Sequence, residues 1–581
     1  MKKTKWLSLI LGISVMLTAC SNSSGGGSGS GSGSGTNDPE IIPDTPINRN
    51  VELKNIQVQA IELDQEYDLS EYAGKKVFLV YQNDTNEDID VFVNQTSSSM
   101  AEPDLVNELI KASGHYYSVP YNPPELPFEY VKASPYSINA NRSAARSVAE
   151  PSIGDKRDFY GYDKNDIIDV NLAKGAVLKA IGEHCYVWYV AKNGIKVTDT
   201  MLNTLAETFD SIFEKETYLF GSNIPTNPYS DIIEIDSDTK IDIIVYDLFG
   251  DVETTKKNGG GVMGYFTSLD FQNQDQKYQG KIYYSNKSEC LHMDSYFLEV
   301  ATEAQRSTIA HEFQHLLHYV NKSINAPQIE WYKEDGTVGG TTLQTSKTWF
   351  NEMMSMTCED IMQSQLGVKN EESPKARLST FNYNHNLGFT TWRDRDSDGE
   401  YDVYASYANA YAFGAYLVRN YGIDFIKELA HNEYVDEAAI TAALVAVDAP
   451  EKTFDEAYDK YYNVILNPKA TSYTLNKAVE KTYNDIAGNK TVKFECSAIN
   501  LFDYLTVNFK YMTEEEYPHY YQGSKYNNYY GPIVWDNGYF WLKVGPKGTG
   551  ISHIDISTNT KAKLPSARFS SKLSYFVAIA E

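Results

Sequence analysis

Cysteine is scarce in this sequence. Only five cysteines occur among 581 residues, at positions 20, 185, 290, 358 and 496, and no two of them form a Cys-x-x-Cys pair. A small disulfide-stapled domain or a cysteine-based zinc finger needs closely spaced cysteines. The sequence therefore argues against both of these classes.

Basic residues are outnumbered by acidic ones. The chain has 51 Lys and Arg against 78 Asp and Glu, which gives a formal net charge of −27 at pH 7. A surface this acidic repels the phosphate backbone of DNA or RNA. We therefore expect no nucleic-acid partner.

Long apolar runs are missing as well. The one marked run, residues 6–17, follows Lys2, Lys3 and Lys5 and is too short to span a bilayer. A basic start followed by a short apolar run is typical of a secretory signal peptide, here residues 1–19. Its removal would take away three lysines and no acidic residue, leaving a charge of −30. No later segment has eighteen consecutive apolar residues, so we expect the remainder to be exported and soluble.

The apolar run ends in Leu17-Thr18-Ala19-Cys20, which looks like a bacterial lipobox, in which the cysteine thiol receives the lipid. Residues 21–35 are almost entirely Gly and Ser, and residues 36–50 are polar with three prolines. A flexible tract of about thirty residues reaches about 30 Å. Residues 20–50 are therefore expected to tether a domain to the bacterial cell envelope, facing the periplasm or the exterior. The alternative is an ordinary secretory signal with a chance cysteine.

Hydrophobic residues make up 42% of the chain and aromatic residues 13%, as in a folded protein of several domains. Short alternating segments in residues 51–97, with the clearest strand at 76–81, predict a small β domain. Residues 98–157 are rich in proline and are expected to form a linker.

The central part, residues 158–470, changes from strands to helices along the chain. Strands are predicted at 186–190, 241–246 and 281–284, a helix begins near Thr198, and helices dominate residues 295–465. Alternation returns in residues 471–581, with strands predicted at 504–509, 540–544 and 575–579. The sequence therefore predicts an α+β fold with a mixed sheet, a helical subdomain and flanking N- and C-terminal β modules.

One segment carries a pattern with chemical meaning. Residues 307–320 contain His311-Glu312-x-x-His315 inside an amphipathic helix. Two imidazoles four residues apart project from one helix face and can share a zinc ion, while Glu312 can accept a proton from water. The alternative is a solvated helix face that matches the pattern by chance.

A catalytic zinc ion needs a third protein ligand. A third histidine six residues after His315 is excluded because position 321 is Asn. A glutamate from a downstream helix is the other common arrangement, and Glu352 in Trp349-Phe350-Asn351-Glu352 fits it. Glu359 or Asp360, two turns further on, would then accept a hydrogen bond from a ligand imidazole. Glu330 and Glu334 remain alternative ligands, although their surroundings predict a hairpin.

These residues resemble a known family, the hyicolysin-like neutral zinc metallopeptidases. The likeness rests on residues 310–315, on Trp-Phe-Asn-Glu at 349–352 and on 407–417, and it covers roughly residues 158–465. It implies a zincin-like catalytic domain in which His311, His315 and Glu352 bind zinc and Glu312 is the general base. Many relatives have Asp four residues after the glutamate ligand, where this chain has Met356.

Related glutamate-liganded enzymes use a Tyr or His to stabilise the oxyanion. The resemblance therefore implies such a role for Tyr411, which lies in a Tyr-x-x-Gly setting, or else for Tyr407.

A weaker motif follows downstream. Asp394, Asp396 and Asp398 precede Gly399 at every second position, as in calcium-binding loops. The twelfth position is Ala405 rather than Glu, so an acidic surface turn is the alternative to a calcium site.

The sequence as a whole predicts a membrane-tethered zinc endopeptidase that acts on proteins or peptides. The alternative from another class is a non-catalytic adhesion or scaffold lipoprotein that keeps a peptidase fold.

Overall fold

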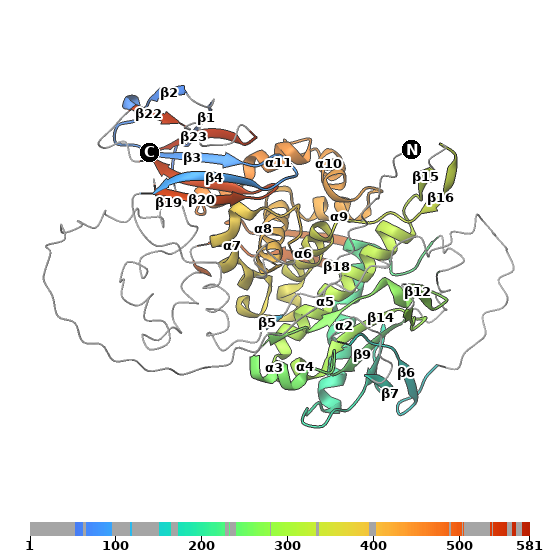
Figure 1. The fold of residues 1–581 in the computed structure, drawn as a ribbon. Coiled ribbons are helices and arrows are strands. Elements are labelled where there is room, and N and C mark those ends of the chain that lie inside the picture. The colour runs from blue at the N-terminus through green and yellow to red at the C-terminus, as the bar shows by residue number, and fades with distance from the viewer. Residues whose placement is uncertain are drawn as a thin grey trace, which may run out of the picture.

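The structure is a computed structural model of the chain. It describes residues 53–61, 65–95, 117–118, 150–163, 172–226, 232, 240–258, 260–278, 281–332, 336–393, 403–486, 490–501, 503–504, 535–536, 538–554, 561–564 and 572–581. Helices and mixed strands alternate first and a helical region follows, so the predicted α+β class is confirmed (Figure 1).

A six-stranded sheet lies at the lower right of Figure 1 and has the strand order β11-β14-β9-β8-β7-β6. Its middle strands β8 (Cys185–Tyr189), β9 (Ile241–Tyr246) and β14 (Cys290–Asp294) run parallel. All their residues are buried, because helices and loops cover both faces of a parallel sheet. The flanking strands β6 (Lys156–Phe159), β7 (Ala173–Ile181) and β11 (Gly264–Tyr265) pair antiparallel.

The helix predicted from Thr198 is α2 (Asp199–Phe220), which connects β8 to β9. The Thr198 side chain caps it by accepting a hydrogen bond from the Met201 N–H at 3.3 Å. The strand predicted at 281–284 is β13 (Lys281–Tyr283), but among the described strands it pairs only with β12 (Gln276–Tyr278). The central strand at this point of the chain is β14, which the sequence analysis did not predict.

Most helices of the second half pack as a group in the centre of Figure 1, whereas α4 (Ser295–Val300) lies at the lower edge of the molecule. Their bounds are α4 (Ser295–Val300), α5 (Thr302–His318), α6 (Thr348–Leu366), α7 (Leu378–Asn384), α8 (Val403–Tyr421), α9 (Ile423–His431), α10 (Asp436–Ala446), α11 (Phe454–Tyr461) and α12 (Asn463–Leu466). Helix α6 packs between α5 and α8. Among the described helices, none is long and apolar enough to cross a membrane.

A hairpin, β15 (Ile329–Tyr332) and β16 (Val338–Thr342), joins the turn after α5 to α6, as predicted for this stretch. A second hairpin, β17 (Val479–Ile486) and β18 (Lys490–Cys496), packs with β17 on α9 and β18 on α6.

The two ends of the chain share their sheets. The order β1-β23-β3-β21-β19 places β3 (Lys76–Gln82) between β21 (Thr549–Ile554) and β23 (Ser574–Ala580), with β1 (Gln57–Ala60) and β19 (Trp535–Asp536) at the edges. In the same way β4 (Ile89–Gln95) pairs with β20 (Gly538–Val544) and β2 (Gln65–Asp68) with β22 (Lys561–Leu564). We call strands β1–β4 and β19–β23 the terminal β unit. Strands of the two predicted flanking β modules, residues 51–97 and 471–581, therefore lie together in one unit.

Strand β3 is central to two cores. Val77, Leu79 and Tyr81 lie in the core of the terminal β unit, whereas Phe78 and Val80 lie in the main core of the helical part. Alternate side chains of a strand point to opposite faces, so β3 joins the terminal β unit to the rest of the molecule. Most of the predicted linker, 98–157, the strand predicted at 504–509 and residues 1–52 lie outside the described residues.

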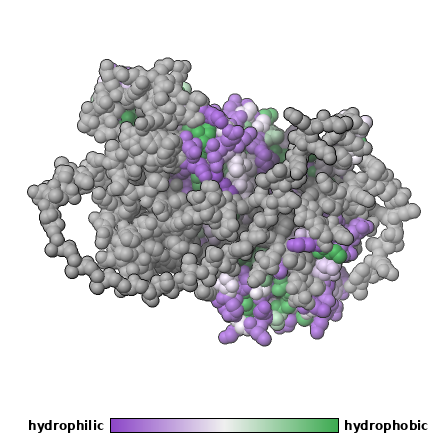
Figure 2. Space-filling view, viewed as in Figure 1, coloured by the Kyte–Doolittle hydropathy of each residue, from purple (hydrophilic) through white to green (hydrophobic). Residues whose placement is uncertain are grey.

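The coloured surface in Figure 2 is mostly hydrophilic, with smaller hydrophobic areas between. This agrees with the mean hydropathy of the sequence, which is −0.44.

Candidate metal centre

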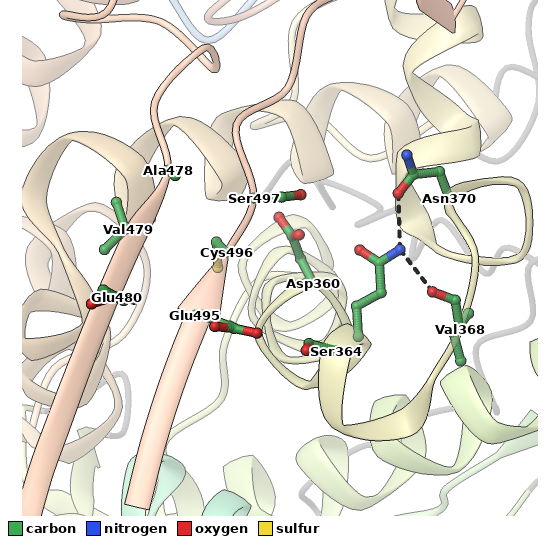
Figure 3. A pocket seen from close by; sticks show the side chains of 11 residues that line it. Asp360, Ser364, Val368, Asn370, Ala478, Val479, Glu480, Glu495, Cys496 and Ser497 are labelled. Carbon is green, nitrogen blue, oxygen red and sulfur yellow. Dashed lines mark hydrogen bonds between the residues drawn. The ribbon is translucent and has the colours of Figure 1, made fainter.

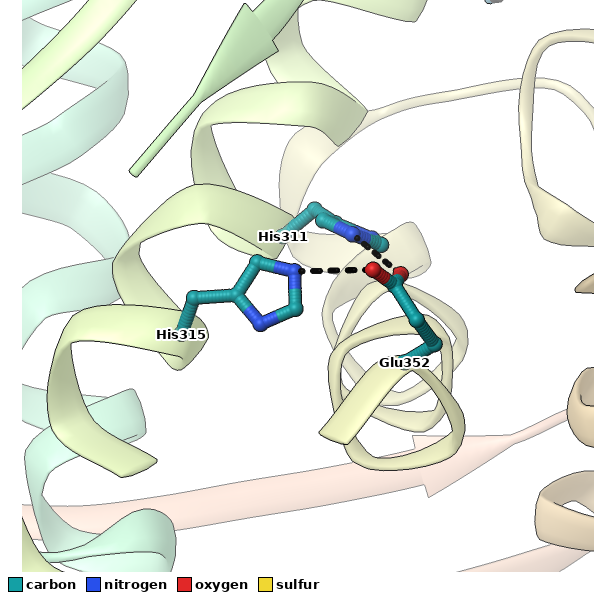
Figure 4. Close-up of side chains that lie close together, drawn as sticks. All are labelled: His311, His315 and Glu352. Carbon is teal, nitrogen blue, oxygen red and sulfur yellow. Dashed lines mark ion pairs between the residues drawn. The ribbon is translucent and has the colours of Figure 1, made fainter. Parts of the chain in front are cut away.

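Three side chains from two helices converge on one point (Figure 4). His311 and His315 project from α5, and Glu352 projects toward them from the first turns of α6. The His311 Nε2 and Glu352 Oε2 atoms are 3.2 Å apart, and His315 Nε2 and Glu352 Oε1 are 3.7 Å apart. The four-residue spacing of the histidines on a helix is what places both rings on one face.

The three residues fit a zinc ion. Tetrahedral zinc with bonds of roughly 2.0–2.1 Å requires ligand atoms about 3.3 Å from one another, close to the two distances just given. The ligand atoms of all three lie within 4.8 Å of one another, and no other group in the described part of the chain offers such a set. Glu352 is 1% exposed, and its Oε2 atom accepts no hydrogen bond from any described residue. A buried carboxylate oxygen without a donor is costly, and a cation at this point would satisfy it.

Each imidazole is held from behind by its other nitrogen. The Nδ1 atom of His311 lies 2.7 Å from Glu359 Oε1, and Ser307 donates to the same carboxylate. The Nδ1 atom of His315 lies 3.0 Å from Asn351 Oδ1 and 3.0 Å from Ser355 Oγ. Such contacts fix the ring orientation and direct Nε2 toward a metal ion. Asn351 stands next to Glu352 in the motif Trp349-Phe350-Asn351-Glu352, but no contact with an imidazole was predicted for it.

Burial and charge act in opposite directions on the three residues. Burial disfavours the charged ring of His311, but the neighbouring carboxylates of Glu352 and Glu359 outweigh burial and raise the pKa of His311. Burial lowers the pKa of His315 to about 4. Burial alone would raise the pKa of Glu352, but the neighbouring imidazoles hold it below its usual value. The centre therefore favours an ionised Glu352 and a neutral His315, the forms that bind zinc.

Glu312 lies beside this centre on α5 and is 6% exposed. Burial raises the pKa of Glu312 to about 8, with Glu352 and Glu359 adding to the effect, while the backbone N–H of Phe266 donates to the carboxylate. Phe266 directly follows β11, the edge strand of the six-stranded sheet. Glu312 thus stands between the metal centre and this sheet edge.

The two candidate tyrosines of α8 have different surroundings. The hydroxyl of Tyr411 is fully buried and donates to Asp360 at 3.2 Å. Tyr411 therefore does not face the metal centre, and its choice as the first candidate for the oxyanion is wrong. Tyr407 does face it, because it lies near enough to Glu352 and Glu312 for both carboxylates to act on its hydroxyl. Burial, together with the carboxylates of Glu352 and Glu312, raises the pKa of Tyr407.

Asp360 also lies away from the metal centre. Its carboxylate accepts from Arg419 Nη1 at 2.6 Å and lies 3.3 Å from Lys375 Nζ, and both cations are buried. Burial alone would raise the pKa of Asp360, but these two cations hold it below its usual value. Of the two predicted acceptors, Glu359 contacts a ligand imidazole and Asp360 does not, because adjacent helix residues point in different directions.

The alternative ligand Glu330 is not part of the centre. Glu330 lies on the β15–β16 hairpin and accepts a hydrogen bond from Tyr332 at 2.8 Å. Glu334, Cys20 and the calcium candidates Asp394, Asp396 and Asp398 lie outside the described residues.

A cavity of about 550 Å³ lies next to α6 but does not include the metal centre (Figure 3). It is lined by Asp360 and Ser364 from α6 and by Glu480, Glu495 and Ser497 from the β17–β18 hairpin and its end. None of the three converging residues lines it, so this cavity and the metal centre are separate.

Comparison with known proteins adds a family to this geometry. Residues 184–476 match the model of the family described as Peptidase M30. The chain is also 26% identical over 284 residues to the neutral metalloprotease ShpI of Staphylococcus hyicus. The aligned region covers 48% of this chain and 54% of that protein. The chain thus spans about half the length of this curated relative. Since the family match extends over half of the sequence and includes every residue of the candidate centre, the chain belongs to the peptidase M30 family.

Proposed function

We propose that this protein is a zinc endopeptidase that hydrolyses bonds in proteins or peptides. The observation that carries the proposal is the convergence of His311, His315 and Glu352 around a buried carboxylate oxygen that has no hydrogen-bond donor among the described residues. Glu312 lies beside this point, and the family match supports a hydrolase of this class.

His311, His315 and Glu352 would hold the zinc ion, which supplies Lewis acidity at the scissile carbonyl and acidifies water. Glu312 would act as the general base that accepts a proton from the attacking water and returns it to the leaving amine. Burial raises the pKa of Glu312 to about 8. A general base is most effective when its pKa is near the working pH, and the raised value suits proton transfer near neutrality.

Tyr407 is the proposed donor to the oxyanion. Its hydroxyl lies at the carboxylate of Glu352, and burial keeps that hydroxyl protonated. A fixed donor at this place would support the negative charge that develops on the carbonyl oxygen.

The sheet edge supports an extended substrate. Strand β11 pairs only with β14 among the described strands, and Phe266 at its end contacts Glu312. An extended peptide can add to such an edge by backbone hydrogen bonds, which favours an endopeptidase over an enzyme for small molecules.

We also propose that Cys20 carries a lipid that tethers the enzyme to the bacterial envelope. Stable anchoring requires the acyl chains, so a Cys20→Ser variant should remain unlipidated and fail to partition into detergent. Lipid labelling that persists in this variant would contradict the proposal. A calcium ion at Asp394, Asp396 and Asp398 stays a prediction from the sequence.

The test of the peptidase proposal uses the chain from residue 51, a proteome-derived peptide library and mass spectrometry, with and without a zinc chelator. The wild type should contain close to one zinc per chain and cleave only without chelator. Glu312→Gln should keep zinc but lose cleavage by a factor of 10² to 10⁴. Glu330→Gln, on the exposed hairpin, is the matched control and should cleave like the wild type. A zinc-loaded wild type without any cleavage would exclude the proposed activity.

A further inference from the structure

One of the contacts between the terminal β unit and the helical part is a tight turn, residues 545–548 between β20 and β21. This turn packs on the segment 385–393, which lies between α7 and α8. The Gly545 N–H donates to the Asn386 carbonyl at 2.9 Å, and the Phe389 N–H donates to the Pro546 carbonyl at 3.3 Å. The two backbones are therefore hydrogen-bonded directly to each other.

The close packing at this turn leaves no room for a side chain at Gly545, Gly548 or Gly388. A Cβ atom on Gly545 would lie 1.9 Å from the Leu387 carbonyl oxygen, and one on Gly548 would lie 2.0 Å from that of Asn386. On the opposite side a Cβ on Gly388 would lie 2.0 Å from the Pro546 carbonyl oxygen, and Gly388 has a φ of +71°. Glycine is required here because the backbones approach so closely.

Side chains strengthen the same contact. The Asn386 amide donates to the Lys543 carbonyl at 2.8 Å, and His385 Nδ1 lies 2.6 Å from the Thr549 carbonyl oxygen. Arg393 forms a two-pronged ion pair with Asp88 of the terminal β unit, with Nη1 and Oδ2 3.0 Å apart. The segment 385–393 is thus held by the terminal β unit along most of its length.

The other side of this segment faces the helices of the metal centre. The Trp392 ring meets the Tyr407 ring edge to face, with centroids 4.8 Å apart. The Arg393 N–H donates to Ser406 Oγ at 2.9 Å, one residue before Tyr407. Phe389 packs on Trp349, three residues before Glu352, with centroids 5.4 Å apart. The segment therefore links the turn to both α8 and α6.

We propose that Gly545 and Gly548 are positioning residues of the metal centre, which act through the segment 385–393 and Trp392 on the ring of Tyr407. This inference rests on the proposed peptidase function. Displacement of a catalytic group by about 1 Å can cost on the order of 10² in rate. If the turn is forced away, Trp392 no longer fixes Tyr407, while the zinc ligands remain on α5 and α6.

The test compares Gly548→Val with Gly74→Val. Gly74 belongs to the same β unit, has a φ of +83° and has open space around its Cβ position, so its substitution strains the unit away from the turn. Gly548→Val should lower kcat by tenfold or more with zinc content and KM nearly unchanged, and Gly74→Val should not. Asp88→Ala, a milder loss of the Arg393 ion pair, should show a smaller loss in kcat and serves if Gly548→Val does not fold.

A double-mutant cycle separates positioning from general destabilisation. In a Tyr407→Phe background, Gly548→Val should cause little further loss of kcat, because the group on which it acts is already removed. Two results would overturn the inference. One is that Gly548→Val lowers kcat by the same factor in the Tyr407→Phe background as in the wild type, and the other is that Gly548→Val and Gly74→Val lower kcat equally.

A second measurement is independent of catalysis. Hydrogen exchange in residues 385–393 and 403–411 should speed up in metal-free Gly548→Val and not in Gly74→Val. If the wild type cleaves no peptide, the proposed function fails, and this exchange pattern still decides whether the turn holds the segment. Unchanged exchange in Gly548→Val would overturn the inference by itself.

Discussion

The two tyrosines Tyr407 and Tyr411 lie one turn apart on α8, yet their hydroxyls meet different partners. Tyr407 lies at Glu352, and Tyr411 donates to Asp360 in the buried charge cluster. We expect Tyr407→Phe to lower kcat about a hundredfold, on the order of 3 kcal/mol, at full zinc occupancy and with little change in KM.

Tyr411→Phe is the matched control. It removes one buried hydrogen bond, so it should lower the free energy of unfolding by about 1 kcal/mol and leave kcat near that of the wild type. Steady-state kinetics on zinc-loaded protein and chemical denaturation measure the two effects. A Tyr411→Phe variant that loses more activity than Tyr407→Phe would reverse the assignment.

Glu216 on α2 is a buried acid that the proposed reaction does not use. It is 0% exposed, no described nitrogen or oxygen donor bonds to its carboxylate, and the Cys358 thiol is its polar neighbour. Burial raises the pKa of Glu216 well above its ordinary value. At a pH above the ordinary pKa of a glutamate, the carboxyl is ionised in the unfolded state but still protonated in the folded state. The unfolded state then binds fewer protons, so Glu216 makes the free energy of unfolding fall as the pH rises.

We therefore expect Glu216→Gln to stabilise the metal-free protein as the pH increases from about 4. The gain over the wild type should grow by about 1.4 kcal/mol for each pH unit, until the folded carboxyl itself ionises. Chemical denaturation at several pH values measures this, with Glu207→Gln on the exposed side of α2 as the control. A gain that does not depend on pH would show that Glu216 is not protonated in the folded state.

At the scale of single elements, α6 separates metal binding from structural support on its two sides. Glu352 and Glu359 are seven residues apart, about two turns, and face α5, whereas Asp360 faces Arg419 and Lys375. We expect Glu359→Ala to weaken zinc binding by 10-fold to 100-fold, because the His311 ring loses its support.

Asp360→Asn should act on stability instead. It leaves two buried cations without their carboxylate and should cost about 3–5 kcal/mol of the free energy of unfolding. Zinc affinity, measured by competition with a chelator on the folded fraction, should stay close to that of the wild type. Loss of zinc affinity in Asp360→Asn but not in Glu359→Ala would contradict the geometry described for α6.

The elements that could be predicted from the sequence are those whose pattern is local. Helices α2, α5, α6 and α8 follow the helical spacing of their apolar residues, and β8 and β9 are short apolar runs. Strand β14 was not predicted because the polar residues His292 and Asp294 interrupt its run of apolar residues. Both are buried and satisfied by distant partners, since His292 contacts Asp270 and Asp294 accepts the Leu248 N–H. Such partners come from tertiary structure and leave no local signal.

The same limit applies to the site. The His-Glu-x-x-His pattern fixes the positions of two imidazoles because both stand on one helix. Which of Glu359 and Asp360 turns toward them depends on the crossing of α5 and α6 and on the partners Arg419 and Lys375. The choice between Tyr407 and Tyr411 depends on the same packing.

At the scale of the whole molecule, the ends of the chain are held together by a sheet. Strand β3 lies between β21 and β23, β2 pairs with β22 and β4 with β20, so residues 65–95 cannot leave without breaking four strand pairings. We expect a cut introduced between residues 98 and 116, through an inserted protease site, to leave both fragments associated.

Size-exclusion chromatography after cleavage tests this, and the fragments should separate only in denaturant. Fragments that separate in native buffer would mean that β3 does not hold the ends together. The pairing also explains why sequence patterns suggested two modules, because strands show which residues are apolar but not which distant strand they pair with.

The position of β3 has a consequence for how the protein is made. Gln82 at the end of β3 pairs with Ser574 on β23, which follows it by about 490 residues. At a synthesis rate of 5–20 residues per second, this separation is a delay of roughly 25–100 s at the ribosome. During that time the apolar face of β3 has no strand to cover it, so we expect chaperones to shield it during synthesis. The terminal β unit, which holds the segment beside Tyr407, can therefore be completed only after β23 has been synthesised. A nascent chain should remain inactive as a peptidase until β23 has emerged.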